Sequence, residues 1–229
     1  MSAPGIAVVG EGVIQNMGML DLRGSSNEDI ARIKSIENVA CIIVPISRQG
    51  ALANVPKKNV AITIPVPDGA NVRMHVGQLN ITGESLETVN DPDAIFIIVG
   101  QVLISSPVKK IGYKHLQVVG QILAPKGSEA ALTQGITSLT GQIIYYSGNA
   151  RFFLGNETFS REFLEFADKP MTMVMVGNFE FARDVTVDVL KKHVSEIFLI
   201  GNLKAPKALI PCVQYLCREK TGNIGESHA

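Results

Sequence analysis

The sequence predicts an α/β fold in which parallel β-strands stack as the rungs of a repeat solenoid, with short helices between the strands. Three observations predict it. A cassette of apolar residues, a glycine, an amide or acid, and further apolar residues recurs along the 229-residue chain. Most cassettes follow one another at steps of about 20 to 24 residues, a length typical of leucine-rich repeats. Between cassettes the apolar spacing becomes helical. A parallel β-helix is the alternative architecture.

The glycine of each cassette is here called its pivot, because glycine allows a positive φ or a close approach where a rung bends. The clear pivots are Gly10, Gly77, Gly100, Gly120, Gly141, Gly155, Gly177 and Gly201. Fainter cassettes have their pivots at Gly24, Pro45, Pro65 and Gly222. We expect Gly100, Gly120, Gly141, Gly155, Gly177 and Gly201 to lie in one column at strand spacing.

The spacing of the pivots also predicts how the chain is divided. The short steps run from Gly10 to Gly24, from Pro65 to Gly77 and from Gly141 to Gly155. A repeat array forms one continuous body, so the whole chain, 1–229, is expected to be a single solenoid domain. The short steps suggest three related blocks within it, at about 1–65, 66–141 and 142–229.

Helices are expected between the strands. Ser25 and Glu28 have the spacing of a capping box, and they begin a predicted helix over residues 25–36. The clearest other helix covers 184–193, which ends in basic residues that suit a helix carboxyl end. Shorter helical pieces are predicted at 129–132, at 161–166 and from Pro206 to Leu216. Pro211 would break or kink the last of these if it lies past the first turn. Residues 50–67 are predicted to be strands joined by loops.

The alternation around each pivot predicts a face that needs covering. The apolar residue before the pivot and the amide after it share one face, and the core-directed residues lie on the other. A sheet that is apolar on both faces is usually covered on both. The candidate interface comprises Val76, Gln78, Val99, Gln101, Val119, Gln121, Val176, Asn178, Ile200 and Asn202. Its amides are expected to form a hydrogen-bonded ladder, and a row of ligand-binding groups is the alternative.

Composition narrows the functional classes. Lys plus Arg equals Asp plus Glu, at 21 each, so no net field attracts nucleic acid. The three cysteines form no Cys-x-x-Cys pair, which argues against a disulfide framework or a zinc site and for a reducing compartment. The amino terminus does not look like a signal peptide, and no segment is apolar enough to span a bilayer. A cytoplasmic protein without membrane insertion is expected, with export by a route that needs no signal peptide as the alternative.

No motif assigns a reaction. Residues 6–12 resemble half of a dinucleotide fingerprint, but Gln15 stands where its third glycine belongs. None of the four histidines has a cysteine or carboxylate at ligand spacing. We therefore predict no catalytic residue, no metal and no cofactor.

One part of the chain resembles the leucine-rich-repeat-like solenoids of uncharacterised bacterial proteins. It consists of the cassette around Gly177, the helical residues 185–193 and the cassette around Gly201. The fixed Leu and buried Asn consensus of standard leucine-rich repeats is absent. The resemblance implies an interaction scaffold and transfers no catalytic residue. The expected function is a non-catalytic scaffold that binds a protein partner or another copy of itself. The alternative is a solenoid enzyme acting on polysaccharide or acyl groups.

Overall fold

The structure is a computed structural model that describes residues 12–227. Within them, parallel strands form three sheets, and short helices lie between the strands along the chain. In each sheet, neighbouring strands follow one another in sequence. The expected class of parallel strands alternating with short helices is confirmed at this level. The predicted pivot at Gly10 lies outside the described residues.

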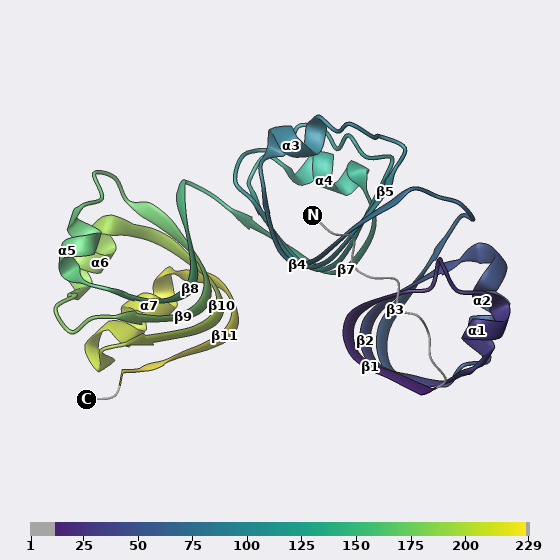
Figure 1. Cartoon of the computed structure of the whole chain (residues 1–229). Coiled ribbons are helices and arrows are strands. Elements are labelled where there is room, and N and C mark those ends of the chain that lie inside the picture. Colours follow the sequence, from purple (N-terminus) through teal and green to yellow (C-terminus); the bar gives the residue numbers. More distant parts are fainter. Residues whose placement is uncertain (1–11, 228–229) are drawn as a thin grey trace. The chain divides into compact units, whose positions relative to one another are not determined.

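The strands of each sheet bend, and the helices lie on the concave side (Figure 1). The first sheet and the helices that connect its strands follow the order β1 (Gly12–Asp21), α1 (Asn27–Ala31), β2 (Ile33–Pro45), a 3₁₀ turn (Ile46–Arg48), α2 (Gln49–Ala53) and β3 (Lys57–Val66). The second contains β4 (Val72–Ile81), α3 (Gly83–Glu87), β5 (Ile95–Ile104), β6 (His115–Pro125), α4 (Glu129–Gly135) and β7 (Ile136–Tyr146). The third contains β8 (Asn149–Phe159), α5 (Arg161–Glu165), β9 (Met171–Phe181), α6 (Val187–His193), β10 (Val194–Ala205), a 3₁₀ turn (Lys207–Leu209), α7 (Ile210–Leu216) and β11 (Cys217–Glu226).

The chain divides into two compact units, one ending at Ile143 and the other beginning at Ile144. The first unit holds the first two sheets, and the second holds the third sheet. The two short steps from Pro65 to Gly77 and from Gly141 to Gly155 are the places where one sheet ends and the next begins.

The pivots stack in register, but in two columns rather than one. In the second sheet Gly77 pairs with Gly100, and Gly100 pairs with Gly120. The third sheet has its own column, made of Gly155, Gly177, Gly201 and Gly222. The single column expected from the sequence is therefore wrong. Gly141 and Gly155 belong to different sheets, because only Ser147 and Gly148 link β7 to β8, too short a connection to bring the chain back for a parallel strand of the same sheet.

Gly177 shows why glycine is needed inside a column. Its φ is +138°, a conformation that L side chains rarely adopt, and a Cβ placed there would lie 1.9 Å from the carbonyl oxygen of Gly155. Gly155 begins the column and also has a positive φ, of +96°, but a Cβ would meet nothing within 4 Å. Glycine inside the column is thus fixed by both conformation and stacking, whereas at the first rung conformation alone requires it.

The first sheet bends at asparagines, which corrects the prediction that Gly24, Pro45 and Pro65 would be its pivots. Asn16, Asn38 and Asn59 have φ of 60°, 52° and 54°. Asparagine tolerates the left-handed region because its short polar side chain can form local hydrogen bonds. Gly24 lies in a turn after β1, and the two prolines lie at the ends of β2 and β3 instead.

The helices are short, and four of them begin at a hydroxyl cap. The side chains of Ser26, Thr82, Ser160 and Thr186 each accept a hydrogen bond from a backbone N–H in the first turn of α1, α3, α5 and α6. The predictions at 129–132, 161–166 and 184–193 are confirmed with shifted ends. Pro211 sits in the first turn of α7, where a missing N–H costs nothing.

One helix prediction and one strand prediction in the first sheet were wrong. The capping box is formed by Ser26 and Asp29, one residue later than expected, and α1 ends at Ala31. Ile33 and Ile36 belong to β2 and point their side chains into the core as strand residues. Residues 49–53, at the start of the segment predicted to be strand, form α2. β-branched residues at a helix-like spacing were misleading, because they suit a bent strand equally well.

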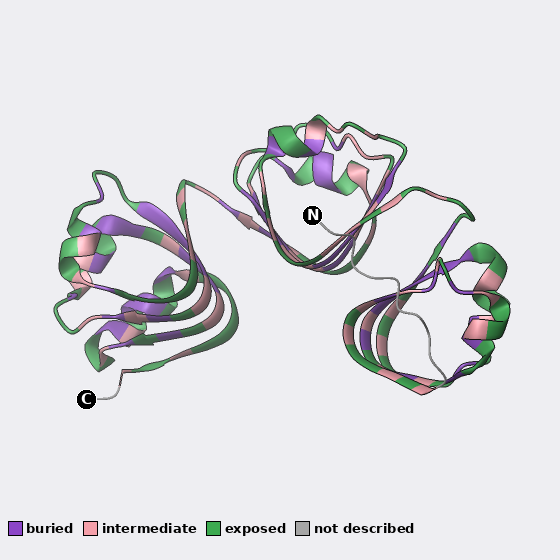
Figure 2. Ribbon diagram, in the orientation of Figure 1, coloured by how far each residue is buried: buried purple, intermediate pink, exposed green. Residues whose placement is uncertain are grey.

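The second unit has one core between the concave face of its sheet and its helices. Phe159, Phe181 and Met175 from the strands pack with Leu164 and Leu190 from the helices, all at 0% exposure. Figure 2 shows buried and more exposed stretches along these strands; in β9 residues 171–175 are all buried, and alternation is seen only around Phe179 and Phe181. Phe179 and Phe181 lie on the core side, and the corresponding Val102 and Ile104 of β5 are also buried, as the alternation predicted.

The first unit has a core within its first sheet and another between its two sheets. Ile30 of α1 and Leu52 of α2 pack on the concave face of the first sheet. The opposite face of that sheet carries Cys41, Ile43 and Ile64, and these residues form one cluster with strand residues of the second sheet. The two sheets therefore share an apolar layer on their convex faces.

Candidate functional site

The best surface for recognition is the part of the convex face of the third sheet at and beyond the pivots, since Val174 and Phe198 earlier on the same face are buried. Here β8, β9 and β10 each place one apolar residue before the pivot and one asparagine after it, whereas β11 has Thr221 before its pivot. The apolar residues are Leu154, Val176 and Ile200, and the asparagines are Asn156, Asn178 and Asn202. Leu154 is 43% exposed, Val176 and Ile200 are half-buried, and the three asparagines are exposed. We call these six residues the amide face.

The asparagines of the amide face form a ladder. Asn202 Nδ2 donates to Asn178 Oδ1 at 2.8 Å, and Asn178 Nδ2 donates to Asn156 Oδ1 at 2.9 Å. The predicted hydrogen-bonded ladder is present here, because in-register strands bring identical side chains within reach of one another. In the second sheet Gln101 Nε2 donates to Gln121 Oε1 at 3.4 Å, a longer contact. The shorter asparagine gives the tighter ladder.

A second ladder in the first sheet was missed by the sequence analysis. Asn38 Nδ2 donates to Asn16 Oδ1 at 3.0 Å, and Asn59 Nδ2 donates to Asn38 Oδ1 at 2.8 Å. The same asparagines supply the positive φ of the bends. A signal was available, since these asparagines recur at the repeat spacing. A cassette defined by its glycine does not include it.

Two of the three predicted apolar interface residues in the second sheet are not available to a partner. Val99 and Val119 are only 6% and 8% exposed, and they belong to the apolar layer shared with Cys41, Ile43 and Ile64 of the first sheet. The cover expected from helices or a second molecule is here another sheet of the same chain. Val76, on the edge strand β4, remains 50% exposed. Gln78 of the same strand is also exposed, while Gln101 and Gln121 are half-buried.

An open groove of about 520 Å³ runs along the amide face beyond the pivots. It is lined by the asparagines Asn156, Asn178 and Asn202, by Glu157, Thr158, Phe179 and Glu180, and by Lys204. Strand register places Thr158 beside Glu180 and Glu180 beside Lys204, so a second polar row lies parallel to the ladder. The groove therefore offers amide, carboxylate and ammonium groups at strand spacing, beyond the apolar residues of the amide face.

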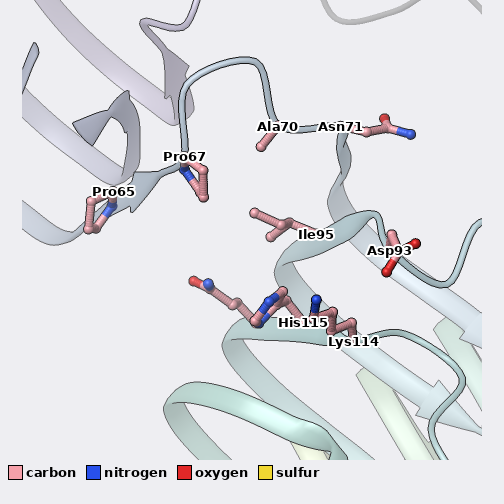
Figure 3. A pocket seen from close by; sticks show the side chains of 9 residues that line it. Pro65, Pro67, Ala70, Asn71, Asp93, Ile95, Lys114 and His115 are labelled. Atoms are coloured by element: carbon pink, nitrogen blue, oxygen red, sulfur yellow. The ribbon is translucent and has the colours of Figure 1, made fainter. Parts of the chain in front are cut away.

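A second cavity, of about 440 Å³, lies in the first unit (Figure 3). Pro65, Pro67 and Ala70 line one side, from the end of β3 and the link that follows it. Ile95 and His115 line the other side, at the starts of β5 and β6. Asn71, Asp93, Lys114 and Gln117 complete the lining.

Backbone bonds fix the rim of this cavity. Ile95 N donates to Asn71 O at 2.9 Å, and Lys114 N donates to Pro92 O at 2.8 Å. The Asn71 side chain donates to the carboxylate of Asp91. Among residues 12–227, no hydrogen bond or ion pair joins the side chains of Asp93, Lys114 and His115 to one another. The cavity thus holds an acid, an ammonium and an imidazole without the mutual contacts of a catalytic group.

Several ionisable groups have shifted pKa values, and each shift has a structural cause. Hydrogen bonds from Ser26 lower the pKa of Asp29, and hydrogen bonds from Ser47 lower the pKa of Asp68. Burial raises the pKa of the Cys41 thiol to about 12 and also raises that of Cys212. The cysteines are therefore protonated near neutral pH and lack the thiolate that a nucleophile needs.

The histidines also have structural environments. His193 is 7% exposed, and its Nδ1 lies 3.2 Å from the carbonyl oxygen of Ala167. His75 Nε2 lies 3.1 Å from the carbonyl oxygen of Gln78. Within the described part of the chain, no three His, Cys, Asp or Glu side chains are grouped as metal ligands would be. None of the helices in that part is both long and apolar enough to cross a bilayer.

Comparison with known proteins adds no assignment. The chain matches no family model, no curated protein and no solved structure. Function therefore has to be argued from the surfaces described above.

Proposed function

We propose that this protein is a non-catalytic scaffold built from solenoid-type stacks of rungs, and that it acts by binding protein, most directly other copies of itself. The amide face carries this proposal. It combines exposed Leu154 and half-buried Val176 and Ile200 with a regular row of hydrogen-bonding groups on a sheet, which suits a protein surface better than a small molecule. Stacked sheets also leave edge strands with unpaired backbone groups.

The cavity in Figure 3 is the observation that favours the alternative, a solenoid enzyme acting on polysaccharide or acyl groups. Such an enzyme needs titratable groups that converge on a reacting atom. Asp93, Lys114 and His115 line the cavity without contacting one another, and two prolines form much of the opposite wall. The scaffold is therefore the better supported of the two.

The mass of the protein in solution tests the scaffold proposal. One chain weighs 24.6 kDa. Light scattering over a hundredfold range of concentration is expected to give a larger mass at the upper end that falls towards 24.6 kDa on dilution, because reversible association follows mass action. A constant mass of one chain throughout the series would reject self-assembly.

A further inference from the structure

The convex face of the third sheet lacks the cover that the second sheet has. In the first unit, Val99 and Val119 stand one residue before their pivots, and packing against the first sheet buries them. Val176 and Ile200 hold the same cassette positions on β9 and β10, but they are only half-buried. A face of this kind therefore already packs against another sheet once within the chain, whereas the amide face still exposes the equivalent positions.

The two central strands of the third sheet carry opposite charges on this face. The strand order places β9 and β10 between β8 and β11. Glu180 of β9 and Lys204 of β10 are neighbours in the strand register, and they share the face of the ladder asparagines Asn178 and Asn202. Within residues 12–227, neither charged side chain forms a hydrogen bond or an ion pair. A carboxylate and an ammonium group are thus both free to bind a partner.

From these observations we infer that the amide faces of two copies pack against each other about a two-fold axis that runs parallel to the strands, between β9 and β10. Such an axis sets β9 of one copy over β10 of the other. Val176 then faces the partner's Ile200, and Glu180 faces the partner's Lys204. Each contact occurs twice, as two-fold symmetry requires. This inference rests on the proposed self-assembly and names the surface that carries it.

The charges fix the position of the axis. An axis over β9 would set Glu180 against the partner's Glu180, and an axis over β10 would set Lys204 against the partner's Lys204. Like charges placed together in an interface repel each other. An axis across the strands would set each strand over itself, so Glu180 could not meet the partner's Lys204. The axis between the two central strands therefore gives the complementary arrangement.

The shape of the amide face suits this pairing. Sheets that pack face to face lie about 10 Å apart with nearly aligned strands, the arrangement that an axis along the strands produces. The apolar residues of the two copies meet before the pivots. Beyond the pivots the two grooves, each of about 520 Å³, face each other, and the long side chains of Glu180 and Lys204 reach into the space between them. Each ladder asparagine keeps at least one N–H and one oxygen lone pair for bonds to the partner or to water.

Charge reversal tests the inference, because the pairing joins residues of opposite sign from different copies. Lys204→Glu sets like charges against each other at both contacts, and so does Glu180→Lys. We expect each single variant to raise the dimer dissociation constant at least about a hundredfold. The double variant Glu180→Lys with Lys204→Glu restores opposite charges at both contacts. Its dissociation constant should return to within about tenfold of the wild-type value.

The matched control is Lys169→Glu. It makes the same change in net charge as Lys204→Glu, at an exposed residue in the link between α5 and β9. This link precedes the start of β9, whereas Glu180 lies near its end. The dissociation constant of the control should equal that of the wild type.

Light scattering and circular dichroism on the same samples separate the outcomes. A dimeric wild type and control, folded single variants that dissociate and a double variant that dimerises again would support the paired amide faces. Single variants that dimerise as the wild type does, or a folded double variant that stays monomeric, would overturn this inference and leave the scaffold proposal standing. A wild type that is monomeric at every concentration would reject self-assembly itself. If Glu180→Lys unfolds, Lys204→Glu decides, because Lys204 is exposed.

Discussion

Gly177→Ala is expected to prevent stable folding of the second unit. A Cβ at this position would lie 1.9 Å from the carbonyl oxygen of Gly155, a backbone atom that cannot move without breaking the strand pairing. Alanine would also be strained at a φ of +138°. We expect a loss of more than about 4 kcal/mol in the free energy of unfolding, measured by urea denaturation followed by circular dichroism.

Gly155→Ala separates the free energy lost to a clash between stacked rungs from the free energy lost to an unfavourable φ. Gly155 is the neighbour of Gly177 in the same column and also has a positive φ, but its Cβ would meet nothing within 4 Å. Its replacement should cost about 1 to 3 kcal/mol, the strain of an unfavourable φ alone. Equal losses in the two variants would show that the rungs do not press on one another at the pivots.

Phe159→Ala is expected to have the second large effect. Phe159 is fully buried, and its ring lies 4.8 Å from that of Phe153 and 5.8 Å from that of Phe179, centroid to centroid. Removing it leaves a cavity that rigid strands on one side prevent from collapsing. We expect a loss of about 3 to 5 kcal/mol, measured by urea denaturation.

The matched control is Phe166→Ala. Phe166 follows α5 at 76% exposure, so its removal deletes a ring that water already surrounds. The free energy of unfolding should change by no more than about 0.5 kcal/mol. A loss at Phe166 as large as that at Phe159 would mean that the aromatic core is not where the structure places it.

Much of the fold could be predicted because the cassette has a direct structural cause. A glycine at Gly100 or Gly177 is needed where a strand bends against its neighbour, and the amide after it is held in register by the next amide. Apolar residues at alternate positions, such as Phe179 and Phe181, then face the helices. Local pattern and tertiary contact agree at these rungs, so the sequence alone was sufficient.

The first sheet was harder to predict because asparagine replaces glycine at its bends. At Asn16 and Asn38 the backbone adopts a left-handed conformation. The neighbouring strand leaves room for a side chain there, because the two asparagine side chains hydrogen-bond to each other. Asparagine and glycine can both adopt this conformation, so a pattern defined by glycine alone does not detect the asparagines. The ends of α1 were misplaced because Ile33 and Ile36 fit a helical period and a bent strand alike.

The candidate interface could be predicted only in part, because the sequence shows that a face is apolar without showing what covers it. Val99 and Val176 occupy the same position in their cassettes, one residue before the pivot. Val99 is covered by the first sheet, whereas Val176 remains half-buried on the amide face. Packing of one sheet on another depends on long-range contacts that leave no periodic signal in the sequence.

The central claim is that the cassettes form separate in-register stacks of parallel strands. Nuclear Overhauser contacts between backbone protons test it most directly, because paired strands lie about 4.8 Å apart. We expect contacts that join Gly155 to Gly177 and Gly177 to Gly201, with a separate series that joins Gly77, Gly100 and Gly120. A continuous series in which Gly155 is the paired neighbour of Gly141, or the absence of contacts between successive pivots, would contradict the account.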